Sequence, residues 1–401
     1  MQHVIRAAVF VFSGNSNMSI HFSSEELQAR RDRVCQELQQ RDLHALLCFK
    51  QETDFYLTGY DTFGYCFFQC LVLTAEGAMT LLTRAPDLRQ AQHTSVIQDI
   101  RIWSDQAEAS PARQLRAILQ EHGCQGQRIG IELDAYGLTA FNWRRLEAEL
   151  NGFCKFQDAS DIVNRLRLVK SPAEIEYVKK AACLADDALD AAVAQIRPGA
   201  WEGDILAVMH SAIFQGGGDY PGNEFIIGAG RDALLCRYFS GRKHLARQDQ
   251  LTLEWAGAYR HYHAAMMRTV LVGPVHEAHH TMHQVAVEAL QACEETLKPG
   301  VPVGQVFDAH ARVADSRGLG PHRLNACGYS LGATFTPTWM DWPMLYTGNA
   351  VLAEPDMVFF LHMIFVNSDT GRAMTLGHTV RVTETGCERL SRSPLDLLNA
   401  V

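Results

Sequence analysis

The chain has 401 residues, a formal net charge of −9 and 47% hydrophobic residues, a composition typical of a soluble globular protein with more than one domain. No basic stripe is available to neutralise phosphates, and no run of 18 apolar residues occurs, so neither a nucleic acid nor a membrane is expected as a partner. The eleven scattered cysteines form no CxxC pairs, which excludes a disulfide framework and indicates a cytoplasmic protein.

The first part of the chain, residues 22–168, alternates helical and strand-like patterns. Residues 1–21 are expected to form a disordered extension, because their apolar run is too short for a signal peptide. A capped amphipathic helix is predicted from Ser24 and Glu26 onward in SSEELQARRDRVCQELQQRDL. Strands are predicted in HALLCF, QCLVLTAEGAMTLLT and QRIGIELDA. These patterns predict a smaller α/β amino-terminal domain.

The second part, residues 169–401, opens on a strong helix start. Ser171, Pro172 and Glu174 form a predicted capping box with proline at the first helical position. Further on, RPGAWEGDILAVMH (197–210) is similar to KPGVPVGQVFDAHA (298–311) in its Pro-Gly turn and its apolar spacing. Each copy follows a predicted helix, carries a second predicted helix after its turn, and precedes a predicted hairpin. The order predicts two αβ halves around a pseudo-twofold axis, with a site between the hairpins.

The first hairpin, LEWAGAYRHYHAAMMRTVLVG (253–273), carries few polar groups in an apolar stretch. Side chains alternate along a strand, so Glu254 and Trp255 are expected to point to opposite faces. His263 has the same parity as Ala265 and is expected to share a face with it.

A family resemblance rests on several motifs spread over nearly the whole chain. These are LTGYD (57–61), RLVKSPAEIEYVKKA (167–181), MMRTVLVG (266–273), GYSLG (328–332), EPDMVFF (354–360) and the two Pro-Gly turns. With them the chain resembles the creatinase/prolidase family. The resemblance implies a two-domain α/β protein with a pita-bread catalytic domain and a creatinase-type amino-terminal domain. It also implies a homodimer in which the amino-terminal domain of one chain contributes to the site of the other.

Metallopeptidases of this family bind two divalent metals through five side chains. By motif position these ligands fall on Glu254, Ala265, Tyr329, His362 and Gly377. Alanine and glycine supply no ligand atom, so no metal site and no cofactor are expected. A single zinc site made by His261, His263, His362 and His378 is the alternative.

The resemblance is strongest to the metal-free members, the creatinases and ectoine hydrolases. It implies a metal-independent hydrolase of a non-peptide C–N bond in a small zwitterion with an amidine- or guanidine-type cation, such as ectoine. The carbon of such a cation is already electrophilic, and a carboxylate pairs with it. Glu254 is the expected nucleophile or general base, with both roles open. His362, as an acid/base near neutral pH, and Tyr329 are the other expected catalytic residues.

Arg237 replaces a family histidine and is expected to bind a substrate carboxylate. The other residues expected to contact the substrate are His263, His378, Phe63, Tyr65, Trp339 and Trp342, the aromatic ones through the substrate cation. The alternatives are a metal-dependent Xaa-Pro dipeptidase or aminopeptidase, a catalytically dead small-molecule-binding protein on the same scaffold, and a lyase.

Overall fold

The computed structural model describes residues 20–237 and 241–400, and the chain divides into two compact units, 1–167 and 168–401. The sequence-based boundary lies at 168/169. The extension predicted for residues 1–21 falls outside the described residues, apart from positions 20 and 21. Within the described ranges, no helix is long and apolar enough to cross a membrane.

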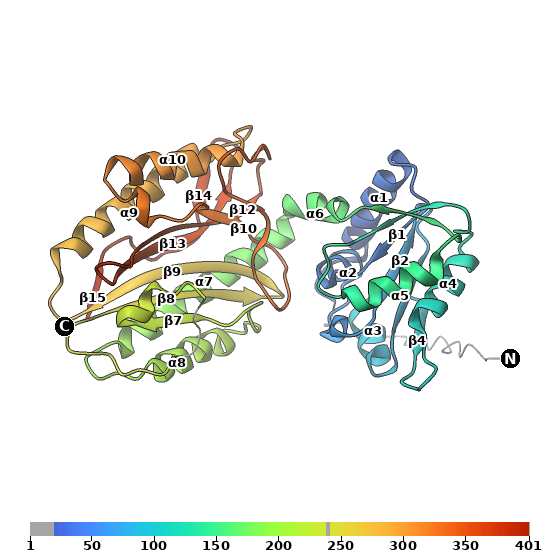
Figure 1. Ribbon diagram of the computed structural model, residues 1–401, viewed down its shortest axis with the longest axis horizontal. Coiled ribbons are helices and arrows are strands. Elements are labelled where there is room, and N and C mark those ends of the chain that lie inside the picture. Colours follow the sequence, from blue (N-terminus) through green and yellow to red (C-terminus); the bar gives the residue numbers. More distant parts are fainter. Residues whose placement is uncertain (1–19, 238–240, 401) are drawn as a thin grey trace. The chain divides into compact units, whose positions relative to one another are not determined.

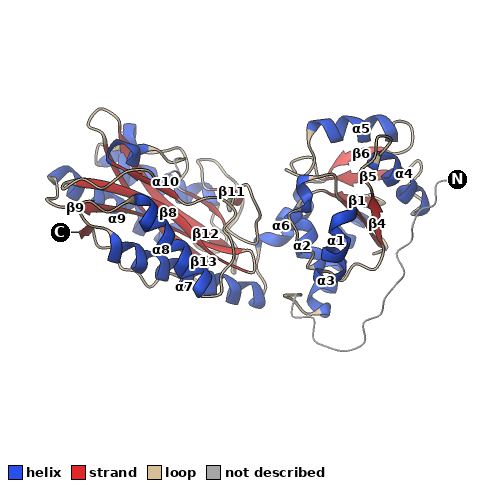
Figure 2. Cartoon of the chain, turned by 90° about the horizontal axis from the view of Figure 1, so that it is seen from below, coloured by secondary structure: helices blue, strands red, loops and turns tan. Residues whose placement is uncertain are grey.

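Unit 1 is built on a six-stranded mixed sheet with the order β4-β3-β2-β1-β5-β6. Helices lie on both sides of this sheet (Figure 2), and apolar side chains are buried on both of its faces. Burial on both faces explains why its central strands are continuous apolar runs. The strands are β1 (Ala45–Cys48), β2 (Cys70–Thr74), β3 (Met79–Arg84), β4 (Ile100–Trp103), β5 (Arg128–Ile131) and β6 (Lys155–Asp158). The helices are α1 (Ser24–Gln40), α2 (Gln51–Thr58), α3 (Leu88–Thr94), α4 (Pro111–Glu121), α5 (Ala140–Leu150) and α6 (Asp161–Leu168), with short turns η1 (Gly64–Cys66) and η2 (Ala85–Asp87).

Unit 2 contains a nine-stranded sheet whose main path is β11-β10-β12-β13-β9-β8-β7, with β14 paired to β13 and β15 to β9. The long hairpins β8–β9 and β12–β13 form the centre of this sheet (Figure 1). The strands are β7 (Ile226–Ala229), β8 (Asp249–Tyr259), β9 (Tyr262–Val272), β10 (Gly328–Ser330), β11 (Asp341–Met344), β12 (Val358–Asn367), β13 (Arg372–Val382), β14 (Cys387–Arg389) and β15 (Leu398–Ala400). The helices are α7 (Pro172–Gln195), α8 (Glu202–Gln215), α9 (Glu277–Thr296) and α10 (Val303–Ser316), with short turns η3 (Gly230–Leu234) and η4 (Gly320–His322).

The predicted capping box at the start of α7 is confirmed. The Ser171 side chain accepts a hydrogen bond from the backbone N–H of Glu174, and the Glu174 carboxylate accepts one from the backbone N–H of Ser171 at 2.8 Å. The other carboxylate oxygen of Glu174 accepts a hydrogen bond from the hydroxyl of Tyr262 at 2.5 Å. This residue therefore stabilises the helix terminus and joins it to the hairpin β8–β9.

The predicted internal repeat is confirmed by the arrangement of unit 2. Each half has two helices, joined by a Pro-Gly turn, and a long hairpin. The turn glycines, Gly199 and Gly300, have φ values of 82° and 81°, a left-handed conformation that favours glycine. Their backbone N–H groups donate hydrogen bonds of 2.8 Å to the carbonyls of Leu245 and Ala353, respectively. The two turns are thus held in the same way in both halves.

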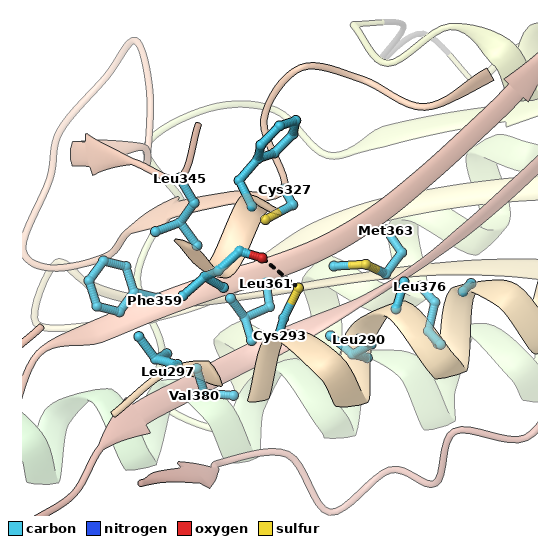
Figure 3. Packing of buried hydrophobic residues seen from close by; sticks show 14 of the residues in the cluster. Leu290, Cys293, Leu297, Cys327, Leu345, Phe359, Leu361, Met363, Leu376 and Val380 are labelled. Carbon is cyan, nitrogen blue, oxygen red and sulfur yellow. Dashed lines mark hydrogen bonds between the residues drawn. The ribbon is translucent and has the colours of Figure 1, made fainter. Parts of the chain in front are cut away.

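The helices α7 and α9 cover one face of the unit 2 sheet, which we call the outer face. Trp255 points to this face and donates an indole hydrogen bond of 2.9 Å to the carbonyl of Ala185 on α7. Figure 3 shows Leu361 and Leu376 packed against α9, where Cys293 donates to the carbonyl of Val306. As predicted, Glu254 points the opposite way from its neighbour Trp255, because side chains alternate along a strand. The face that carries Glu254 is the inner face.

Candidate active site

Four residues form one row across the inner face of unit 2. Glu254 on β8 pairs with Met267 on β9, Met267 pairs with Gly377 on β13, and Gly377 pairs with His362 on β12. Directly paired residues of neighbouring strands project from the same face. The two halves of the repeat therefore bring Glu254 and His362 to the same side of the sheet, as the sequence predicted.

Tyr329, on the short strand β10, completes this cluster. It pairs with Phe360, which has the same parity on β12 as His362, and its ring centroid lies 5.6 Å from that of His362. The hydroxyl of Tyr329 donates a hydrogen bond of 3.3 Å to a carboxylate oxygen of Glu254. The same hydroxyl accepts a hydrogen bond of 2.8 Å from the indole N–H of Trp339.

The carboxyl group of Glu254 lies in a poorly solvated environment, with 8% of the residue exposed. Burial raises its pKa to about 7, although the charge of Arg237 and the hydrogen bond from Tyr329 both act to lower it. A carboxyl group with such a pKa is partly ionised near neutral pH and can gain or lose a proton there.

Arg237 follows η3 and lies at the exposed side of the cluster. Its guanidinium donates to the sulfur of Met340 at 3.9 Å, and its positive charge lowers the pKa values of both Glu254 and His362. A positive charge at this position is suited to the carboxylate of a small substrate.

Glu202 anchors the segment that carries Arg237, and sequence reasoning missed it. Its buried carboxylate accepts hydrogen bonds from the backbone N–H groups of Ala229, Arg242 and Lys243 at 2.8, 2.7 and 2.9 Å. These bonds hold the chain on both sides of Arg237, at Ala229 where β7 ends and at Arg242 and Lys243 before β8 begins. An acidic residue at the first position of α8 was a visible signal, but helix capping alone would have explained it.

His362 lies in the cluster but does not titrate near neutral pH, which corrects the prediction. Burial lowers its pKa to about 3, and the charges of His310 and Arg237 act in the same direction. Its Nδ1 atom is buried and makes no hydrogen bond with any of the described residues. His362 is therefore a neutral imidazole at physiological pH. It can donate and accept hydrogen bonds, but it is not protonated.

His263 faces the same way as Ala265, as predicted, but its ring is fully engaged by the protein. Its Nε2 accepts a hydrogen bond of 2.9 Å from the backbone of Gly222, and its Nδ1 lies 3.1 Å from the hydroxyl of Thr334. Burial lowers the pKa of His263 to about 4. These contacts fix the neighbouring loops, and they do not leave a ring nitrogen for the predicted substrate contact.

His378 lies on the outer face, so the structure corrects its predicted place in the site. It pairs with Leu361 across the hairpin, and its Nε2 lies 2.5 Å from the carboxylate of Glu294 on α9. The neighbouring residue, Gly377, belongs to the inner row. The single step along the strand is what moves His378 to the other side of the sheet.

The predicted aromatic residues do not form one group. Trp339 is 1% exposed and directs its N–H at Tyr329, whereas Trp342 on β11 is 37% exposed. Phe63 is 77% exposed and Tyr65 is buried, and both belong to unit 1. Contacts of Phe63, Tyr65 and Trp342 with a substrate therefore stay predictions.

The inner row does not fit a metal centre. A two-metal site needs several carboxylate ligands that converge, but the row contains Met267 and Gly377 between Glu254 and His362. Throughout residues 20–237 and 241–400, no group of three or more His, Cys, Asp and Glu side chains could hold a metal ion. The alternative zinc set is also split, since His378 and His263 are engaged elsewhere.

Comparison with known proteins agrees with this architecture. Residues 176–384 match Metallopeptidase family M24, and residues 30–169 match the Creatinase/Prolidase N-terminal domain. The chain is 27% identical to the ectoine hydrolase of Halomonas elongata over 95% of this chain and 98% of the relative. It is 24% identical to the Xaa-Pro dipeptidase of Pyrococcus furiosus over 68% and 76%, respectively. The structure of a prolidase from Thermococcus sibiricus, 18% identical, superposes with a TM-score of 0.85 over 94% of this chain and all of that one (100%).

Proposed function

The chain belongs to metallopeptidase family M24, and we propose that, unlike the metallopeptidases of that family, it is a hydrolase that works without a metal ion. Its proposed substrate is a small zwitterion with an amidine- or guanidine-type cation and a carboxylate. The bond to be hydrolysed is a non-peptide C–N bond, as in the opening of the ring of ectoine. The ectoine hydrolase of Halomonas elongata is a relative over nearly the full length, which supports this choice of substrate class.

The observation that carries the proposal is the chemistry of the inner row. Glu254 is its single carboxylate, and the neighbouring positions Met267 and Gly377 offer no second acid to bind a divalent metal. An organic cation needs only one carboxylate partner, and it brings its own electrophilic carbon. A peptide carbonyl, in contrast, needs an external Lewis acid or an oxyanion hole.

The reaction on an amidinium consumes one water molecule. Water adds to the amidinium carbon and forms a C–O bond, while Glu254 accepts a proton from the water. The C–N bond then breaks as the departing nitrogen takes up the proton held by Glu254. The hydroxyl of the intermediate loses the second water proton to the same nitrogen as the new C=O forms, so the products are an amide and an ammonium group. Direct attack by the Glu254 carboxylate on the same carbon is the other route, and both require the ionised carboxylate.

Arg237 and Tyr329 have supporting roles in this proposal. The guanidinium of Arg237 pairs with the substrate carboxylate at the exposed side of the cluster, which orients the cation toward Glu254. The hydroxyl of Tyr329 donates to Glu254 and so holds its carboxylate in one orientation.

A turnover screen tests the proposal. Purified protein is incubated with ectoine, hydroxyectoine, creatine and Xaa-Pro dipeptides, and products are detected by mass spectrometry. Ring opening of ectoine or hydroxyectoine gives one product of the substrate mass plus one water, whereas hydrolysis of creatine or a dipeptide gives two fragments. We expect turnover of an amidine or guanidine substrate, and none by the Glu254→Gln variant. Turnover of only the dipeptides would assign a peptidase, and thermal stabilisation by a ligand without any turnover would assign a binding protein.

A further inference from the structure

The hydrogen bond between Trp339 and Tyr329 gives the tyrosine hydroxyl a defined direction. An indole N–H only donates, so at 2.8 Å it occupies one lone pair of the Tyr329 oxygen. The single proton of that hydroxyl must then point elsewhere, and its acceptor in the structure is the Glu254 carboxylate at 3.3 Å. If Glu254 were the donor instead, the tyrosine would accept twice and its own buried proton would lose this partner.

We propose that Trp339 is a positioning residue that fixes Tyr329 as a hydrogen-bond donor toward Glu254. This inference rests on the proposed function of Glu254, and it replaces the predicted contact between the Trp339 ring and a substrate cation. Trp339 acts on the reacting atoms only through Tyr329.

The packing around Trp339 and Tyr329 favours this positioning role. Trp339 is 1% exposed, and its backbone N–H donates to the side-chain oxygen of Asn223 at 3.1 Å. The ring of Tyr329 packs edge-on against Phe360, with centroids 5.4 Å apart. Neither ring can turn without breaking these contacts, so the direction of the hydroxyl is set before a ligand binds.

Among the described residues, four titratable or charged groups face Glu254 from the elements around it. Tyr329 lies on β10, His362 on β12, and Arg237 and Cys236 on the segment between η3 and β8. His362 stays neutral, and burial together with Glu254 raises the pKa of Cys236. The indole N–H of Trp339 donates its hydrogen bond to the Tyr329 hydroxyl and not to Glu254 itself, so the contributions of Trp339 and Tyr329 can be separated by mutation.

The test measures the titration of Glu254 in the ligand-free protein by infrared difference spectroscopy, with Glu254→Gln identifying its carboxyl band. Because no substrate is needed, a failed turnover screen leaves this result interpretable. In Trp339→Phe the Tyr329 donor weakens, and we expect the Glu254 titration to move to higher pH by about 0.1 to 0.6 of a unit. In Tyr329→Phe we expect a larger rise, of about one unit.

Trp255→Phe is the matched control. Trp255 is also buried, its indole N–H donates at 2.9 Å, and it lies beside Glu254, but it points to the outer face. This variant should lose stability without moving the Glu254 titration. Benzothienylalanine at position 339, which replaces the N–H by sulfur and keeps the bicyclic shape, provides a second variant if Trp339→Phe folds poorly.

The double variant decides between a positioning role and a direct one. In the Tyr329→Phe background, Trp339→Phe should add no further shift to the Glu254 titration, because its effect passes through the missing hydroxyl. An unchanged titration in both position-339 variants would overturn the inference. So would a shift in the double variant that equals the sum of the two single shifts.

Discussion

Tyr329 and Glu254 join the two halves of the unit 2 sheet through a hydrogen bond of 3.3 Å. Tyr329 belongs to β10 in the second half of the repeat, and Glu254 belongs to β8 in the first. Their contact assembles the site from hairpins that are far apart in the sequence. It also places the single carboxylate of the inner row next to a hydroxyl donor, which is the arrangement on which the proposed chemistry depends.

The activity should rise with pH through the titration of Glu254. The carboxylate is the reactive form, and burial raises its pKa to about 7, so kcat/KM should increase between about pH 6 and pH 8 and then level off. A bound organic cation favours the ionised form, so the corresponding rise in kcat should lie at lower pH. Steady-state kinetics at constant ionic strength check this, and a flat or falling profile over the same range would refute it.

Glu254 should reduce the stability of the fold at neutral pH. Its folded-state pKa, about 7, lies above the ordinary value of 4.5, so the folded chain binds this proton more tightly than the unfolded chain does. The stabilisation from this bound proton is fully present below pH 4.5. It is lost as pH rises from 4.5 to 7, and the free energy of unfolding falls by about 3 kcal/mol in total. Glu254→Gln should melt above the parent at pH 8, and the difference should shrink toward pH 4.5. Equal melting temperatures at pH 8 would contradict the assigned environment.

Arg237→Ala should weaken substrate binding. Loss of a charge-assisted contact with a carboxylate corresponds to a rise in KM of about 10- to 100-fold. The KM of Arg237→Lys should lie between those of the parent and Arg237→Ala, because lysine keeps the charge but not the planar fork. Arg237→Ala should also move the rise of kcat/KM with pH to higher pH, since the charge of Arg237 lowers the pKa of Glu254. Arg242→Ala, with an exposed side chain on the same segment, is the control. Parent-like kinetics in Arg237→Ala would remove this residue from the site.

Glu202→Gln should destabilise unit 2 and raise KM together. The carboxylate accepts three backbone hydrogen bonds, and an amide nitrogen cannot accept, so at least one of these N–H groups loses its partner. The expected loss of unfolding free energy is about 1–3 kcal/mol. Glu277→Gln is the control, because Glu277 is also the first residue of a helix but is exposed. Similar thermal melts for the two variants would show that Glu202 does not anchor the segment.

Local features of the fold could be predicted from the sequence because their causes are local. The capping box at Ser171, the two turn glycines and the opposite orientation of Glu254 and Trp255 each depend on a few neighbouring residues. The same alternation also places His378 away from Gly377, so its outward position was readable and was missed.

Other features depend on contacts between distant segments. The role of Glu202 arises from backbone groups about 27 to 41 positions later in the chain, which no spacing rule connects to it. The low pKa of His362 is a consequence of its burial, and burial is set by the packing of the whole unit. The hydrogen bond of Trp339 similarly required the three-dimensional meeting of its loop with β10.

The most direct test of the central claim is turnover by protein freed of metal. The protein is dialysed against a chelator, its metal content is verified by elemental analysis, and the hydrolysis of an amidine zwitterion such as ectoine is measured beside that of an Xaa-Pro dipeptide. We expect the metal-free protein to hydrolyse the amidine at the rate of the untreated protein, and added Mn²⁺, Co²⁺ or Zn²⁺ to leave that rate unchanged. Hydrolysis of the dipeptide that appears only when metal is restored would contradict it.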